Sequence, residues 1–228
     1  MILYRTIEKD GFAEQVIDRS RFLAFARPAS SKDAADAFFA EIRARYRDAT
    51  HVVPAFIVGP KKELEWASDA GEPQGTSGPP ILAMLEKEDL TNVAVAVVRY
   101  FGGRLLGMGG LVRAYSSSAK AAVENAGIAE AAELVRFTAS FSYPALGKIE
   151  NRAKEGAFRI HSPVYAENVS VTVETSPEEE ETARGILIEL TSGTVRLGSS
   201  ERTVGLLPVL PNCAEKMKID LDKTGKEA

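Results

Sequence analysis

A glycine-rich run, residues 99–115, constrains this chain more than any other feature. Five glycines fall between positions 102 and 110, after a hydrophobic stretch and before an alanine-rich one. Because glycine has no Cβ, another backbone or a ligand can approach such a loop closely. The pattern predicts a strand, a tight loop and then a helix, whose first N–H groups and dipole would favour an anion.

The surroundings of this run are free of acidic residues. No Asp or Glu occurs in residues 90–123, although the 228-residue chain has a formal net charge of −4. The overall acidity argues against a protein that coats nucleic acid indiscriminately, but it leaves room for a localised basic patch. Guanidinium groups suit phosphate. The cations of this stretch are Arg99, Arg104, Arg113 and Lys120.

The run does not match the common nucleotide-binding motifs. Gly102 and Gly107 have the Walker A separation, but Met108 stands where the lysine belongs. The dinucleotide fingerprint that begins at Gly107 would need its third glycine at Val112. The alternative is a tight, close-packed turn that binds nothing. As an anion or nucleic-acid site, the run offers Arg99, Tyr100, Gly102, Gly103, Arg104, Gly107, Gly109, Gly110 and Arg113.

A second loop, residues 69–80 (the carboxylate loop), is also rich in turn formers but differs in its chemistry. Pro79 and Pro80 have no N–H, so the helix start that follows loses two donors for an anion. Asp69 and Glu72 add negative charge. The loop would present carboxylates to a cation or bind back to the glycine-rich run. We hypothesise an internal pair between Glu72 and an arginine of that run.

His51, Asp69 and Glu72 form the alternative candidate for chemistry. If they converge, they would supply acid/base or metal chemistry for a small-molecule hydrolase or a peptidase-like enzyme. Their spacing matches no motif, and no G-x-S-x-G sequence supports a serine nucleophile. We therefore expect a structural histidine at a strand end, no metal, no cofactor and a non-enzymatic protein.

Hydrophobic periodicity predicts two α+β domains, over residues 1–130 and 131–217. In the first, strands are expected at 3–8, 13–28, 51–59 and 93–98, with helices from an N-cap at Ser30, from 81 and over 111–125. The all-apolar stretch 93–98 is typical of a strand covered on both faces. In the second, the expected order β-α-β-β-α-β is the ferredoxin-like plan.

The remaining features place few further limits on function. Residues 218–228 are polar and read as a disordered tail. The single cysteine, Cys213, excludes an intramolecular disulfide and fits a reducing cytoplasm. No apolar run approaches the ~20 residues that would span a membrane, and the first residues do not resemble a signal peptide. The oligomeric state is left open.

Several blocks of the sequence resemble the signature blocks of the IMPACT/YigZ family. They include Ser68-Asp-Ala-Gly-Glu-Pro-Gln-Gly-Thr-Ser-Gly78, Arg99-Tyr-Phe-Gly-Gly103 and Gly107-Met-Gly-Gly-Leu-Val-Arg-Ala-Tyr-Ser116. Tyr143-Pro-Ala-Leu-Gly-Lys-Ile-Glu-Asn151 resembles the start of the bacterial C-terminal domain. Two departures occur, because Ala70 replaces a usual aspartate and Val53 stands near the place of a cysteine often found after the histidine. Both weaken a reading that needs a dense catalytic cluster around His51 and Asp69.

The resemblance implies a first domain similar to the second-domain superfold of a small-subunit ribosomal protein, and a ferredoxin-like second domain. The pair resembles domains IV and V of elongation factor G, and eukaryotic relatives are regulators of translation. The resemblance therefore implies a cytoplasmic protein that binds RNA or the ribosome and acts in translation or its regulation. A protein-interaction module, with a purely structural glycine-rich run, is a further alternative.

Overall fold

The computed structural model describes residues 1–209. The chain divides into two compact units. The larger comprises Tyr4–Glu130 with the described residues from 206 onward, and the smaller comprises Met1–Leu3 and Ala131–Gly205. Cys213 and the predicted tail at 218–228 lie outside the described residues. No helix within residues 1–209 is long and apolar enough to cross a membrane.

The larger unit is built on a five-stranded antiparallel sheet in the order β2-β3-β6-β4-β5. β6 lies at its centre and is buried from Val93 to Arg99, which confirms a strand covered on both faces. The strands of this sheet span Gly11–Ile17 (β2), Ser20–Pro28 (β3), His51–Val58 (β4), Leu64–Ala67 (β5) and Val93–Tyr100 (β6).

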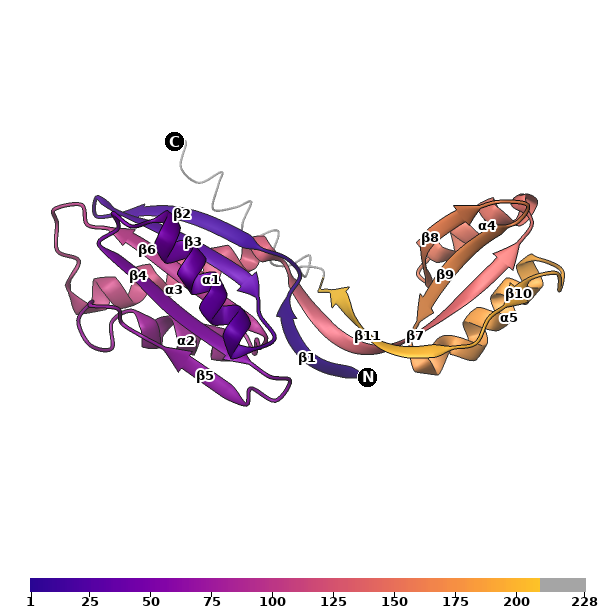
Figure 1. Ribbon diagram of the computed structural model, residues 1–228, viewed down its shortest axis with the longest axis horizontal. Coiled ribbons are helices and arrows are strands. Elements are labelled where there is room, and N and C mark those ends of the chain that lie inside the picture. Colours follow the sequence, from indigo (N-terminus) through magenta and orange to yellow (C-terminus); the bar gives the residue numbers. More distant parts are fainter. Residues whose placement is uncertain (210–228) are drawn as a thin grey trace, which may run out of the picture. The chain divides into compact units, whose positions relative to one another are not determined.

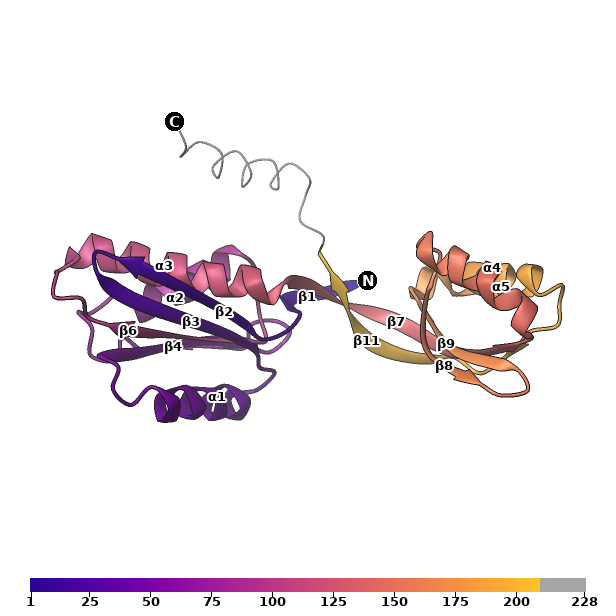
Figure 2. The ribbon, with the colours of Figure 1, turned by 90° about the horizontal axis from the view of Figure 1, so that it is seen from above.

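Helices cover both faces of this sheet (Figure 2). α1 (Lys32–Arg45) packs on one face against β4 and β6, while α2 (Gly78–Lys87) and α3 (Gly107–Ala126) lie together on the other. The N-cap of α1 is Ser31, one residue beyond the predicted Ser30, and its Oγ accepts from the Ala34 N–H at 3.2 Å. α3 begins at Gly107 rather than at the predicted residue 111.

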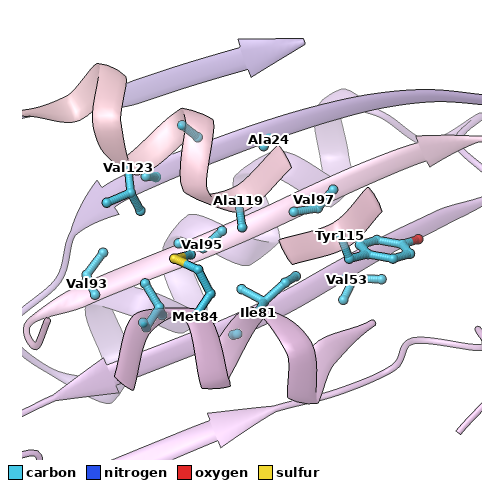
Figure 3. Packing of buried hydrophobic residues seen from close by; sticks show 14 of the residues in the cluster. Ala24, Val53, Ile81, Met84, Val93, Val95, Val97, Tyr115, Ala119 and Val123 are labelled. Atoms are coloured by element: carbon cyan, nitrogen blue, oxygen red, sulfur yellow. The ribbon is translucent and has the colours of Figure 1, made fainter. Parts of the chain in front are cut away.

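The layer between the sheet and α2/α3 is a continuous apolar core (Figure 3). Val93, Val95 and Val97 project from β6 toward Ile81 of α2 and Ala119 of α3. Small side chains on α3 let it approach the sheet closely, and its alanines at 114, 119, 122 and 126 are all buried. The core therefore fixes α2 and α3 side by side, with the two glycine-containing loops leading into them (Figure 1).

The smaller unit has the element order β-α-β-β-α-β and both of its helices on one face of the sheet (Figure 2). The sheet that contains β7 has the strand order β1-β7-β9-β8, with β10 and β11 also paired to β7, and β1, β7 and β11 each include residues of both units. The predicted combination of helices and strands in an α+β class is confirmed, and the paired strands of both sheets are antiparallel. The strands are β1 (Ile2–Ile7), β7 (Ile128–Phe141), β8 (Arg159–Tyr165), β9 (Val169–Thr175), β10 (Arg196–Leu197) and β11 (Glu201–Pro208), and the helices are α4 (Tyr143–Lys154), a short 3₁₀ turn (Pro177–Glu179) and α5 (Glu180–Leu190).

Candidate functional site

The glycine-rich run leaves β6 and turns into α3 through residues 101–106. Gly102 packs directly on the chain after β2, because a Cβ there would lie 2.0 Å from the carbonyl oxygen of Arg19. Gly103 and Gly107 have φ of +80° and +69°, a region that side chains disfavour. These three glycines therefore have structural reasons to be glycine, as the close-packed alternative predicted.

Gly109 is different, because the structure gives no steric or conformational reason for a glycine at this helical position. The nearest atom to a Cβ there would be the Arg113 Nη1, at 4.0 Å. The N-cap of α3 is Leu106, which makes no side-chain cap, and the first turn has no acidic residue. Among residues 1–209, no side chain accepts a hydrogen bond from the first N–H groups of α3, which lie at an exposed surface around Gly107 and Gly109.

Two of the predicted arginines face solvent beside this helix start. The Arg104 side chain is 69% exposed and pairs with Asp18 at 3.1 Å. Arg113 is exposed, and no ion-pair partner for its guanidinium occurs among residues 1–209. Because exposed pairs contribute at most about 1 kcal/mol, the Arg104–Asp18 pair would exchange readily for a stronger anion.

Arg99 points into the protein instead. Its side chain is 6% exposed, and its Nη1 donates to Glu72 Oε1 at 2.7 Å. The hypothesised internal pair between Glu72 and an arginine is therefore confirmed. The expectation that Arg99 contacts an external anion is corrected. Its guanidinium is buried and already paired with Glu72, so it does not reach the surface.

A polar network surrounds this buried ion pair. Tyr115 on α3 donates its hydroxyl to Glu72 Oε1 at 2.6 Å. Burial and then the neighbouring Glu72 carboxylate raise the pKa of the Tyr115 phenol far above its usual range, so it remains a hydrogen-bond donor. Arg99 Nη2 reaches Ser20 Oγ at 3.4 Å, and Ser20 Oγ also accepts from the Gly102 N–H at 3.2 Å. The network thus links the carboxylate loop to the start of the glycine-rich run.

Tyr100, the other predicted contact on β6, lies on the opposite face from Arg99. Its hydroxyl donates to Asp48 Oδ1 at 3.0 Å, and its ring packs in the cluster beneath α1. Burial and then this carboxylate raise the pKa of the Tyr100 phenol. Tyr100 is therefore separated from the start of α3 by the sheet itself, as expected for neighbouring residues of one strand.

Asp69 closes the carboxylate loop upon itself. Its Oδ2 accepts from the Gly75 N–H at 2.8 Å, and its Oδ1 accepts from the Ser77 and Gly78 N–H groups, both at 3.0 Å. Burial alone would raise the pKa of this carboxyl, but these hydrogen bonds outweigh it and lower the pKa below its usual value. Asp69 thereby caps the start of α2, a role not predicted from its charge alone.

The alternative catalytic group converges only in part. His51 Nε2 lies 3.9 Å from Glu72 Oε1, too far for a hydrogen bond, while His51 Nδ1 is 3.0 Å from the Ala70 carbonyl oxygen. The Asp69 carboxylate is occupied by the loop backbone. Within residues 1–209, no group of three His, Cys, Asp or Glu side chains is arranged to hold a metal ion.

Sequence reasoning missed the apolar side chains that the glycine-rich run exposes. Leu105, Met108 and Phe101 are 85%, 67% and 45% exposed. The available signal was their position between glycines, where a loop has no core to pack against. Phe101 lies with its ring centroid 5.5 Å from the guanidinium carbon of Arg99.

Comparison with known proteins gives consistent relatives over most of the chain. The sequence matches the Impact N-terminal domain over residues 18–123 and a domain of unknown function, DUF1949, over residues 140–194. It is 37% identical to the IMPACT family member YvyE of Bacillus subtilis, over 88% of this chain and 92% of that protein. It is 36% identical to the IMPACT family member YigZ of Escherichia coli, over 59% and 67% of the two chains.

A solved structure shares the fold as well. A crystal structure described as that of a hypothetical protein is 28% identical, covers 87% of this chain and 98% of its own, and has a TM-score of 0.56. Its description names no activity, so this structure supports the fold of the chain and gives no information on its function.

Proposed function

The chain belongs to the IMPACT family, and on that premise we propose that it is a cytoplasmic, non-enzymatic protein that binds RNA or the ribosome in translation or its regulation. One observation carries the proposal. The exposed, acid-free start of α3 combines uncapped N–H groups with the solvent-facing cations Arg104 and Arg113. Backbone donors and guanidinium groups are the groups that hold phosphate in protein–RNA contacts.

In this proposal the residues of the glycine-rich run have separate tasks. Arg104 and Arg113 contact phosphates, and Gly107 and Gly109 let the nucleic-acid backbone approach the N–H groups of α3. Gly102 and Gly103 shape the turn, and Gly110 of α3 leaves room for Leu106, because a Cβ at Gly110 would lie 2.9 Å from the Leu106 Cβ. Arg99 is a positioning residue, because its pair with Glu72 fixes the end of β6 beneath the loop. Tyr100 belongs to the core beneath α1 in this account.

The family resemblance supports the choice of RNA over other anions. Eukaryotic relatives are regulators of translation, and the resemblance of the domain pair to domains IV and V of elongation factor G is part of the proposal. Fold alone does not fix function. The proposal therefore depends mainly on the charged start of α3, where exposed residues can be substituted without disturbing the core.

The test is the binding of a mixed-sequence 20-nucleotide RNA, followed by fluorescence anisotropy from 50 to 200 mM salt. We expect the Arg104→Ala/Arg113→Ala variant to lose affinity, and the slope of log affinity against log salt to fall by about 1.4, at about 0.7 for each lost phosphate contact. The Arg43→Ala/Arg47→Ala variant removes the same charge from exposed positions in α1 and just after it, and is the matched control. Absence of RNA binding by the natural protein at 50 mM salt, or equal losses in both variants, would contradict the proposal.

A measurement in cells addresses which RNA is bound. Ultraviolet crosslinking followed by sequencing of the attached RNA should recover ribosomal or messenger RNA with the natural protein. The Arg104→Ala/Arg113→Ala variant should recover much less. Equal recovery with both proteins would place the RNA contact elsewhere on the molecule.

A further inference from the structure

A groove of about 930 Å³ lies between α2 and α3, beside the glycine-rich run. The lining residues of α2 include positions 79, 83 and 87, and those of α3 include positions 110, 113, 117 and 120, which follow Leu106 at the N-cap. These spacings each trace one face of a helix. The groove thus runs along both helices, and the ten residues of α2 give it a length of roughly 15 Å at 1.5 Å per residue.

Several of the side chains that line the groove are apolar or small. Pro79 and Ala83 of α2 and Val112 of α3 line it with exposed apolar atoms, and the half-buried Leu106 lies near the end where α3 begins. At Ala83 and Gly110 only small side chains line the groove. Larger apolar side chains from outside would therefore find both contact area and room.

Within the part of the chain that the structure describes, the charged side chains that line the groove include more unpaired cations than unpaired carboxylates. Two carboxylates line the groove, and each already holds a cation: Asp18 pairs with Arg104 at 3.1 Å and Glu88 pairs with Lys120 at 2.9 Å. Lys87 and Arg113 also line it, and neither side chain has an ion-pair partner among residues 1–209. The groove thus combines apolar lining residues with one cation on each helix that has no ion-pair partner among residues 1–209.

These features favour a protein segment over a nucleic acid. Among residues 1–209, no aromatic side chain lines the groove, so a base would find no surface there on which to stack. An amphipathic helix fits better, since it buries apolar side chains at intervals of three or four residues and can carry acidic residues on its flanks.

We infer that the α2/α3 groove is a docking site for an acidic amphipathic helix of a partner protein. About three turns of such a helix span the groove. Its leucine-like side chains lie against Pro79, Ala83 and Val112, and its carboxylates pair with Lys87 and Arg113. This interaction goes beyond the proposed RNA contact and stands on different residues, apart from Arg113.

The test uses a synthetic 15-residue helical peptide with leucines three or four residues apart and glutamates flanking them. A second peptide has lysine in place of every glutamate. Fluorescence anisotropy should show that the acidic peptide binds at least tenfold more tightly than the lysine peptide. The Lys87→Glu/Arg113→Glu variant should reverse this preference, with about a tenfold loss for the acidic peptide, because two exposed charge pairs are lost and made repulsive.

Two further variants keep the result interpretable. Ala83→Trp fills the groove without changing charge and should abolish binding of the acidic peptide. Lys61→Glu/Arg47→Glu changes the net charge equally at exposed sites outside the groove and should leave the peptide affinity unchanged. Nuclear magnetic resonance shifts on adding the acidic peptide should map to α2 and α3.

Three outcomes would overturn the inference. One is absence of binding by the acidic peptide at hundred-micromolar concentration. Another is a preference between the two peptides that the charge reversal does not change. The third is competition by the mixed-sequence RNA for the α2 resonances around Ala83 and Lys87, which the proposed RNA contact does not include. Arg104 belongs only to the proposed RNA contact and Lys87 only to the groove, so the effects at these two residues let either idea fail without the other.

Discussion

The carboxylate loop and the glycine-rich run precede neighbouring helices on the same face of one sheet, yet they direct their polar groups in opposite ways. The carboxylate loop turns its acids inward, where Asp69 binds three backbone N–H groups and Glu72 meets Arg99. The glycine-rich run leaves the N–H groups of α3 uncapped and Arg104 and Arg113 in solvent. The two loops are similarly rich in glycine, but one binds its polar groups internally and the other leaves them exposed to solvent.

The number of cations in a stretch of sequence does not give the charge at the surface, because the direction of each side chain decides whether it reaches solvent. The acid-free stretch 90–123 has four cations, but Arg99 is spent on Glu72 and Lys120 on Glu88. The positive charge that an external anion meets comes from Arg104 and Arg113. A loop is a binding candidate only for the groups that its own fold leaves exposed, as it leaves Arg104, whose side chain is 69% exposed although it pairs with Asp18.

The largest expected effect comes from opening the internal pair. Glu72→Gln leaves the Arg99 charge buried without a counter-ion, so we expect a loss of about 3 kcal/mol in the free energy of unfolding. Urea denaturation measures it, with the exposed Glu86→Gln on α2 as the control. The double variant Glu72→Gln/Arg99→Gln should recover much of the loss. A change below about 1 kcal/mol for Glu72→Gln would mean that the pair does not hold the two loops together.

The second comparison sets one glycine of the run against another. Gly102→Ala forces a Cβ into the Arg19 backbone, so it should cost about 2 kcal/mol in stability. Gly109→Ala meets open space in a helix and should stabilise the protein by about 0.5 kcal/mol, while it weakens RNA binding at the helix start. Thermal unfolding and anisotropy measure the two effects. Equal stability changes at both positions would contradict the division between packed and open glycines.

A smaller effect tests how Asp69 closes its loop. The folded-state pKa of Asp69 is lowered, so its contribution to stability is present above its unfolded pKa, near 4, and is lost as the pH falls through the folded pKa. Asp69→Asn should cost about 1 kcal/mol at pH 7 and flatten the decline of stability between about pH 5 and pH 3. Urea midpoints across this range measure it, and the exposed Asp36→Asn is the control. An unchanged pH profile would contradict the role of Asp69 in holding the carboxylate loop closed.

Much of the fold follows from local patterns in the sequence. The apolar stretch of β6 predicts a strand covered on both faces, and the structure confirms it. The early start of α3 at Gly107 was missed because glycine has low helix propensity. Nothing local predicts that the chain at Arg19 would pack against Gly102, since this contact joins residues far apart in the sequence.

The inward direction of the Arg99 side chain can be predicted from the sequence. Arg99 lies two residues after Val97 and four after Val95, so strand alternation places it on the face that carries the core beneath α2 and α3. Tyr100 falls on the other face by the same rule. The Glu72–arginine pair could be hypothesised from opposite charges in the two loops, whereas the choice of Arg99 over Arg104 and Arg113 required this alternation.

The most direct test of the two-loop account is hydrogen–deuterium exchange with and without the mixed-sequence RNA at 50 mM salt. The account predicts slower exchange of the backbone amides in residues 101–110 when RNA is bound, with no change in residues 69–80. Protection of residues 69–80 instead, or binding of RNA with no protection in residues 101–110, would contradict it.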